Sequence, residues 1–316
     1  MKTLRLLFIA AVCTQMLTSC GNNNRKSTDE SASGEVHLAV DETFRPIMAE
    51  EMRVFALHTP EAEMKPIYCT ETEALNLFLK DSVRMIITTR PLSNKEKQAM
   101  RDVYQLNVRS QRIATDGIAL IVNKQNPDTL ISVNDVKRIV TGQITTWEQI
   151  KNASSKGKLE LVFDNPNSST IRYIKDSICM GLPLKGNLYA QKTNQDVIEY
   201  VSKTRNAIGV IGVDWLRNSA DSTNLSFDPM IRVMSVSNST IAEKGNSYQP
   251  LQYYIGTGNY PFTRSVFMIT SDPRVRSTAL NFYYFVSDTQ GQLIITKSSQ
   301  LLPYMPVQYK EVSVKE

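Results

Sequence analysis

Short apolar runs alternate with segments of helical spacing along almost the whole chain. Runs of strand length lie at residues 35–40, 85–87, 117–122, 159–163 and 207–213. After the first run, apolar side chains recur at three- and four-residue intervals, as on one face of a helix: Phe44, Met48, Met52 and Phe55. No segment of the sequence repeats another. Helices placed between short strands predict an α/β fold with largely parallel sheets covered by helices.

Hydroxyl side chains follow the strands at four places in this pattern. They are Thr43, then Thr70 and Thr72, then Thr88 and Thr89 beside Arg90, and finally Ser168, Ser169 and Thr170 shortly after Asp164. In open α/β sheets, ligands bind beyond the carboxyl ends of the strands. We therefore expect these four turns to line one cleft.

The hydroxyl run at residues 168–170 stands where a helix begins, because isoleucines follow it at helical spacing. The first turn of a helix has unpaired N–H groups at the positive end of the peptide dipoles. An oxyanion can be held there, and serine and threonine hydroxyls add donors that rotate toward it. Plain N-capping of the helix explains the same residues. The repetition at four strand ends favours a receptor for phosphate or a similar tetrahedral oxyanion.

Residues typical of catalytic and metal sites are scarce. The two histidines, His37 and His58, are not spaced as a metal-binding pair, and no GxSxG, P-loop or GxGxxG motif occurs. We therefore expect no enzyme activity, no metal and no cofactor. One alternative is an exported phosphohydrolase that uses Asp164 as an acid or nucleophile. Lysines and arginines are scattered rather than clustered, which argues against nucleic acid as a partner.

The first twenty residues predict export. A basic start precedes the apolar run 6–13, which is shorter than the ~20 residues of a membrane span. The sequence LTSC resembles a bacterial lipobox, so residues 1–20 are expected to form a lipoprotein signal peptide with Cys20 as the lipidated residue. An ordinary signal peptide with an incidental cysteine is the alternative. Residues 21–34 carry no large apolar side chain, which predicts a flexible tether.

Several short motifs occur in one order along the chain and carry a resemblance to a known family. They are ETFRPI from Glu42, TTRPLS from Thr88, VTGQITTWEQI from Val140, NSST from Asn167, NAIGVIGVDW from Asn206, YPFTRSVFMI from Tyr260 and FVSDTQGQLIITKSSQLLP from Phe285. On these motifs the chain resembles the phosphate-binding protein of the bacterial phosphate ABC transporter, from about Glu35 to Val307.

The resemblance implies a type II periplasmic-binding fold, in which two α/β lobes are joined by a hinge of two chain crossings. Lobe 1 would comprise residues 35–116 and 255–316, and lobe 2 residues 117–254. The anion would contact Thr43, the Phe44 amide, Thr70 or Thr72, and Thr88 or Thr89 from lobe 1, and Ser168, Ser169 and Thr170 from lobe 2. Cys69 and Cys179 then lie in different lobes, so we expect two buried thiols rather than a disulfide.

Two charges depart from the pattern of this family. Its well-studied members have an aspartate that accepts the proton of hydrogen phosphate, where this chain has Thr89. They also have an arginine four residues before the hydroxyl run, where this chain has Asp164. We expect Arg90 to bind the anion through its guanidinium, and Asp164 to accept the proton or to pair with Arg90. A surface salt bridge is the alternative role for Arg90.

The resemblance implies capture of a ligand without chemistry. The two lobes would close on phosphate and deliver it to an ABC permease, from a monomer anchored by lipid in the cell envelope. The alternative is an anion-sensing or scavenging lipoprotein without a dedicated permease, which the altered charges favour.

Overall fold

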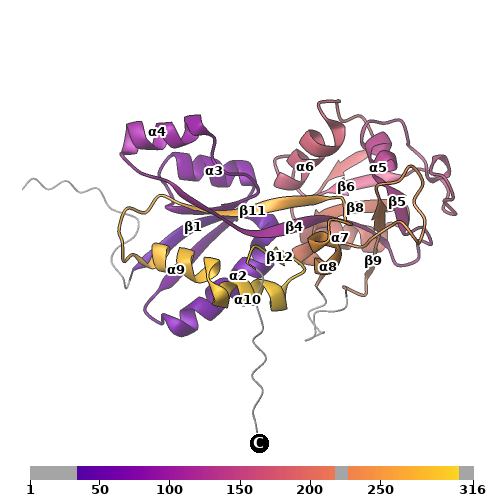
Figure 1. Cartoon of the computed structure of the whole chain (residues 1–316). Helices are drawn as coiled ribbons and strands as arrows, with labels where there is room; N and C mark the ends of the chain where they lie inside the picture. The colour runs from indigo at the N-terminus through magenta and orange to yellow at the C-terminus, as the bar shows by residue number, and fades with distance from the viewer. Residues whose placement is uncertain (1–33, 218–226, 306–316) are drawn as a thin grey trace, which may run out of the picture.

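The computed structural model of the chain describes residues 34–217 and 227–305. Within them, the centre is a ten-stranded sheet in the order β2-β1-β3-β11-β4-β8-β6-β7, with β9 and β12 also paired to β4 (Figure 1). A second, two-stranded sheet pairs β5 with β10. The strands are β1 (Glu35–Asp41), β2 (Glu63–Cys69), β3 (Met85–Thr88), β4 (Arg109–Asn123), β5 (Leu130–Ser132), β6 (Glu160–Phe163), β7 (Leu188–Ala190), β8 (Ala207–Gly212), β9 (Ile231–Val233), β10 (Ser235–Ser237), β11 (Thr263–Thr270) and β12 (Leu302–Pro303).

Helices cover the sheet on both faces. In the first half of the molecule, α3 and α4 lie on one face and α2, α9 and α10 on the other (Figure 1). The helices are η1 (Glu42–Phe44), α2 (Arg45–His58), α3 (Glu71–Leu79), α4 (Asn94–Tyr104), α5 (Val133–Val140), η2 (Trp147–Gln149), α6 (Ser169–Tyr173), the π-helix η3 (Ile174–Cys179), α7 (Asn194–Lys203), η4 (Val213–Leu216), α8 (Gln252–Gly256), α9 (Thr278–Ser287) and α10 (Thr289–Ser298).

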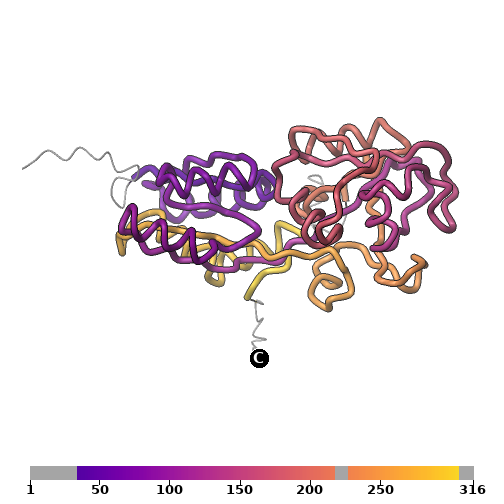
Figure 2. The backbone as a smooth tube through the Cα atoms, turned by 90° about the horizontal axis from the view of Figure 1, so that it is seen from above, coloured from indigo at the N-terminus to yellow at the C-terminus, as the bar shows by residue number. Residues whose placement is uncertain are grey.

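The long strand β4 belongs to two groups of strands. Its residues 109–117 pair with β11, and its residues 118–123 pair with β8 and β9. On one side of it β1 is parallel to β2 and β3, and on the other side β6 is parallel to β7 and β8. Figure 2 shows the resulting halves side by side, joined in the middle by segments of the chain. This is the predicted two-lobed α/β architecture with a two-strand hinge.

The change of partner along β4 supports the lobe boundaries predicted above, 35–116 with 255–316 and 117–254. They remain a prediction, since pairing alone does not define a unit that moves as a rigid body.

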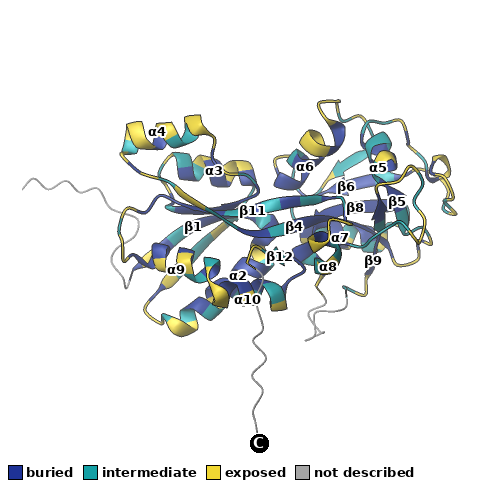
Figure 3. Ribbon diagram, in the orientation of Figure 1, coloured by how far each residue is buried: buried dark blue, intermediate teal, exposed yellow. Residues whose placement is uncertain are grey.

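One apolar core crosses the junction between the halves. Phe44 and Ile47, which open the α2 region, belong to the same buried cluster as Ile211 and Val213 at the end of β8. The central strands, such as β3 and β8, are buried, whereas the edge strands β2 and β7 are not, and α4 and α9 expose their outer faces (Figure 3). Burial of this shared apolar surface, worth about 25 cal/mol per Å², holds the two halves together where the polar strand ends meet.

Local sequence signals explain how the helices start. Ser93 and Glu96 form a full capping box on α4, and the Ser132 hydroxyl accepts from the Asp135 N–H at the start of α5.

The apolar run 117–122 proved to be the second part of β4, which begins at Arg109. Residues 109–112 are exposed or half-buried, so their polar side chains concealed the first part of the strand.

The signal peptide, the lipidated Cys20 and nearly all of the tether 21–34 lie outside the described residues. Across 34–217 and 227–305, the helices are too short or too polar to traverse a bilayer. Both cysteines are free thiols, as predicted; Cys179 is buried, whereas Cys69 is only half-buried.

Candidate anion-binding site

Three elements from the two halves meet around Arg264 of β11. Its Nη1 donates to the Ser169 Oγ at 2.9 Å, at the N-terminus of α6. Its guanidinium carbon lies 5.6 Å from the centre of the Phe44 ring, beside η1. Thr43 and Ser169 are fully buried there. The structure thus brings the end of β1 and the start of α6 together, as the strand-end argument predicted.

Buried polar atoms without a hydrogen-bond partner mark this junction. Among the described residues they include the Thr43 Oγ1, the Thr170 Oγ1, the Arg264 Nη2 and the Asp41 Oδ2. Leaving a buried donor or acceptor unsatisfied costs about 1–3 kcal/mol, so such atoms on residues of β1, η1, α6 and β11 favour a polar ligand at this junction.

Arg264 was not identified as a site residue from the sequence. It is buried, with 5% of its side chain exposed, and its Nε donates to the Asp116 Oδ2 at 2.8 Å. Arg264 and Asp116 are direct partners in the β11–β4 pairing. The available signal was a pair of opposite charges, each just before an apolar run of strand length: Asp116 before 117–122 and Arg264 before 266–269. Charges in such positions are rarely buried unless paired.

Ser168 acts as the N-cap of α6 and also donates to Asp164. Its Oγ accepts from the Ile171 N–H and lies 2.6 Å from the Asp164 Oδ1. Burial raises the pKa of Asp164 to about 7, against the lowering effect of the Ser168 hydroxyl. The other carboxyl oxygen of Asp164 lies 3.4 Å from the Asn194 side-chain amide. Both its oxygens are therefore engaged inside the protein, which does not favour a nucleophilic role.

Arg90 does not pair with Asp164, contrary to the prediction. Its guanidinium binds Glu96 with two hydrogen bonds, of 2.9 and 2.8 Å, and donates to the Pro91 carbonyl. Glu96 lies on the first turn of the helix that follows, so it is the carboxylate within shortest reach. The pair holds the pKa of Glu96 at about 2. Of the two roles considered for Arg90, the salt bridge is the one observed.

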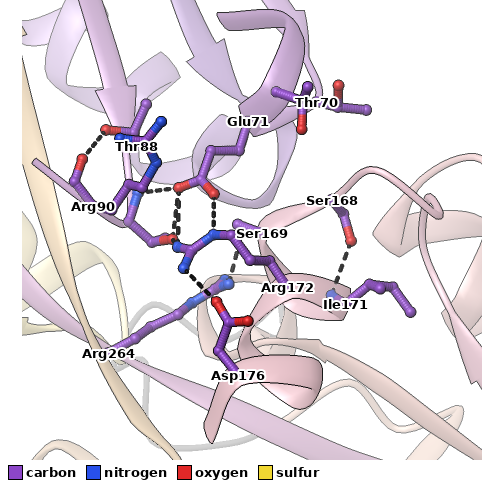
Figure 4. Close-up of polar contacts among 12 residues, drawn as sticks. Thr70, Glu71, Thr88, Arg90, Ser168, Ser169, Ile171, Arg172, Asp176 and Arg264 are labelled. Atoms are coloured by element: carbon purple, nitrogen blue, oxygen red, sulfur yellow. Dashed lines mark hydrogen bonds and ion pairs between the residues drawn. The ribbon is translucent and has the colours of Figure 1, made fainter. Parts of the chain in front are cut away.

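In place of the expected Arg90–Asp164 pair, a different charged contact joins the two halves. The Arg172 Nε of α6 donates to the Glu71 Oε2 of α3 at 2.6 Å, and its Nη2 donates to the Thr89 Oγ1 at 2.6 Å (Figure 4). The backbone N–H and hydroxyl of Thr89 both donate to the Glu71 Oε1 at 2.7 Å. Burial raises the pKa of Glu71, but the Arg172 and Thr89 hydrogen bonds outweigh it and leave that pKa lowered.

The remaining predicted hydroxyls hold the frame of the site. Thr70 is the N-cap of α3. Thr72 donates to the Asn167 carbonyl at 3.3 Å, in the turn before the hydroxyl run, and so joins the halves. Thr88 donates to the Arg90 carbonyl at 2.9 Å. Within the described chain, no group of three or more His, Cys, Asp or Glu side chains is arranged to hold a metal ion.

Comparisons with known proteins agree with this architecture. A family model described as a PBP superfamily domain matches residues 26–289. The chain is 22% identical to the phosphate-binding protein PstS of Borreliella burgdorferi, over 94% of this chain and 97% of that protein. It is also 22% identical to protein SphX of Synechococcus elongatus, over 68% of this chain and 62% of that protein.

Solved structures give the same fold. One, from Clostridium perfringens, is described as a candidate phosphate ABC transporter substrate-binding protein with bound phosphate; the TM-score is 0.70 at 19% identity, over 86% of this chain and all of that one. An ABC-type phosphate transport receptor from Vibrio cholerae matches with a TM-score of 0.62 at 19% identity, over 85% and 100% of the two chains. At these identities the likeness establishes the two-lobed fold.

Proposed function

The chain belongs to the PBP superfamily, and on that premise we propose that it is a solute-binding protein that holds phosphate between its two halves for ABC-type uptake. The observation that carries this proposal is the set of unpartnered buried donors at the junction: the Thr43 Oγ1, the Thr170 Oγ1 and the Arg264 Nη2. The Borreliella burgdorferi relative is a phosphate-binding protein, which supports phosphate as the ligand.

The donors suit a tetrahedral oxyanion because they are supplied by three different elements. Thr43 follows β1, Thr170 lies in the first turn of α6, and Arg264 lies on the hinge strand β11. Hydrogen bonds from a guanidinium to an oxyanion are charge-assisted and roughly twice as strong as neutral ones. We assign Thr43, the Phe44 amide, Ser169 and Thr170 to the anion, with Arg264 rather than Arg90 as the cation.

Binding would proceed by closure of the halves without chemistry. Each half supplies part of the donor set, so the anion binds the closed arrangement better and shifts the population toward it. We also propose that Cys20 carries a lipid anchor, that the protein works as a monomer in the cell envelope, and that a permease receives the anion.

Calorimetry on the purified chain with phosphate, arsenate, sulfate and molybdate tests this function. A Thr170→Val variant keeps the shape of the side chain and removes one donor. We expect phosphate affinity to fall about 10-fold, because a hydrogen bond to an anion is worth about 1.5 kcal/mol or more. The same variant should be at least as stable as the parent, because it removes a buried hydroxyl that has no partner.

The control is Thr257→Val at the C-cap of α8, an exposed residue whose hydroxyl donates to the Tyr253 carbonyl. It should bind phosphate as the parent does. Failure of the parent chain to bind any of the four anions would refute the proposed function.

A further inference from the structure

Thr43 of η1 is fixed at three of its atoms, whereas its hydroxyl is not bonded. The residue is fully buried, and its N–H donates to the Asp41 Oδ1 at 3.1 Å. Its carbonyl accepts from the Trp215 Nε1 at 3.0 Å. Its methyl group lies against Gly212, where an added Cβ would overlap it. The hydroxyl Oγ1 has no hydrogen-bond partner among the described residues. It is the one polar atom of Thr43 left for a ligand.

The contact from Trp215 comes from a distant part of the chain. Trp215 lies on η4, just after β8 and 172 residues from Thr43, and its ring is half-buried. The indole N–H is the only polar group of a tryptophan side chain, and it can only donate. Because a peptide group is planar, this bond to the carbonyl fixes the plane of the peptide that joins Thr43 to Phe44.

The direction of the Thr43 hydroxyl follows from these contacts. A β-branched side chain has few allowed rotamers about its Cα–Cβ bond, so its direction depends on the backbone that carries it. With the N–H and the carbonyl both bonded and the methyl group held against Gly212, the hydroxyl is left facing the junction. An oxyanion would then meet a donor that is already oriented.

The neighbouring residue of η4 supports the same turn at its other end. The Asp214 Oδ2 accepts from the Ile47 N–H at 2.8 Å, in the first turn of α2. Asp214 is 2% exposed. Adjacent side chains of η4 therefore hold residues 43 and 47, and the segment between them cannot shift without breaking a buried hydrogen bond. This makes η4 a support for the turn that carries Thr43.

We propose that Trp215 is a positioning residue for anion binding: it donates to the Thr43 carbonyl and so directs the Thr43 hydroxyl toward the bound oxyanion, without contacting the anion itself. This inference rests on the proposed function and adds a residue that acts through Thr43. Orienting a donor before the ligand arrives strengthens binding, because less freedom is lost on association.

Two substitutions separate the indole N–H from the bulk of the ring. Trp215→Phe keeps an aromatic ring and removes the donor, whereas Trp215→His keeps an N–H at the corresponding position of a five-membered ring and removes the benzene part. Phosphate affinity is measured by calorimetry at about pH 8, where an ordinary histidine is neutral. Urea unfolding of the same variants gives their stability.

We expect phosphate affinity to fall by about 5- to 10-fold in Trp215→Phe, because most of one hydrogen bond to the anion is lost. Trp215→His should bind within about 2-fold of the parent, although it is the less stable variant because it buries less apolar surface. A merely structural role for Trp215 would make affinity follow stability and reverse this order.

A double-mutant cycle shows whether Trp215 acts through Thr43. Thr43→Val removes the hydroxyl, so adding Trp215→Phe to it should change the affinity by less than about 2-fold. Added to Thr170→Val, whose hydroxyl lies on a different element, Trp215→Phe should keep its full effect. Distant, independent sites are additive in this way, whereas residues that act as one unit are not.

Trp147→Phe is the matched control. The Trp147 Nε1 also donates to a main-chain carbonyl at 3.0 Å, that of Asn206, but Trp147 belongs to a different apolar cluster from the one around Phe44. This variant should lose stability and bind phosphate as the parent does. Unchanged affinity in Trp215→Phe, or a loss that persists in the Thr43→Val background, would overturn the inference and leave the proposed function standing. A parent that binds no oxyanion would overturn both.

Discussion

Arg264 and Arg90 show that the surroundings of a guanidinium decide its role. Arg264 is 95% shielded, with Asp116 on one side and Nη2 unbonded on the other. Arg90 has 32% of its side chain exposed and is fully occupied by Glu96. A buried guanidinium with an N–H to spare can receive an anion at little cost in desolvation, whereas Arg90 would first have to leave its partner.

For Arg90→Ala we expect unchanged phosphate affinity, since the charge that the variant loses belongs to the pair with Glu96. Stability should fall by only about 0.2–1 kcal/mol, as for other partly exposed ion pairs. Anion titration and urea unfolding measure the two quantities. A loss of affinity of 10-fold or more, about 1.4 kcal/mol, would return Arg90 to the site.

At the level of elements, the end of β8 touches the turn after β1. A Cβ built on Gly212 would overlap the Thr43 methyl group. The Gly212 N–H donates to the Asn194 side chain at 3.2 Å, and Asn194 in turn donates to Glu42 at 2.7 Å. Glycine at this position therefore permits β8 and η1 to meet, and with them the two halves.

In Gly212→Ala the added methyl group should push η1 away from β8. We expect the free energy of unfolding to fall by about 1–3 kcal/mol, as for other overpacked sites, and phosphate binding to weaken because Thr43 is displaced. Gly245→Ala is the control, because a Cβ there meets nothing within 4 Å. Equal stability and affinity in the two variants would contradict the close contact.

At the scale of the whole molecule, several buried carboxyls are held in their neutral form. Burial raises the pKa of Glu51 to about 9 and that of Asp214 to about 8. In the unfolded chain these groups ionise near their ordinary values, so the unfolded state binds fewer protons than the folded state between those values and the raised ones. Stability therefore decreases as the pH rises through that window.

Glu51→Gln removes one of these groups while keeping its shape. We expect the parent to lose stability between about pH 5 and pH 9, by at most about 1.4 kcal/mol per pH unit for each such group, and the variant to lose less. Urea unfolding at several pH values measures both slopes. Carboxyls with a lowered pKa, such as Glu96 with a pKa of about 2, change the stability only in the acid range, outside this window. Parallel slopes for parent and variant would show that Glu51 is not buried in neutral form.

The sequence supported the fold further than it supported the site. Alternating runs and caps such as Ser93 and Ser132 are local signals, and the structure has the elements they predicted. The burial of Arg264 depends on which strands become neighbours, whereas Glu96, the partner of Arg90, lies only six residues along the chain. Arg264 meets Asp116 only in one antiparallel register of β11 and β4. Arg264 and Asp116 lie 148 residues apart, and Glu71 and Arg172 lie 101 residues apart, so neither pairing can be predicted from local spacing.

The contact between Glu71 and Arg172 affects the rate at which the ligand dissociates. Opening the halves must separate Glu71 from Arg172, whose side chain has 36% of its surface in contact with solvent. Dissolved ions stabilise the separated charges, because the screening distance falls from ~30 Å at 0.01 M salt to ~8 Å at 0.15 M. The dwell time of phosphate on this receptor should therefore shorten in saline surroundings and lengthen in dilute ones.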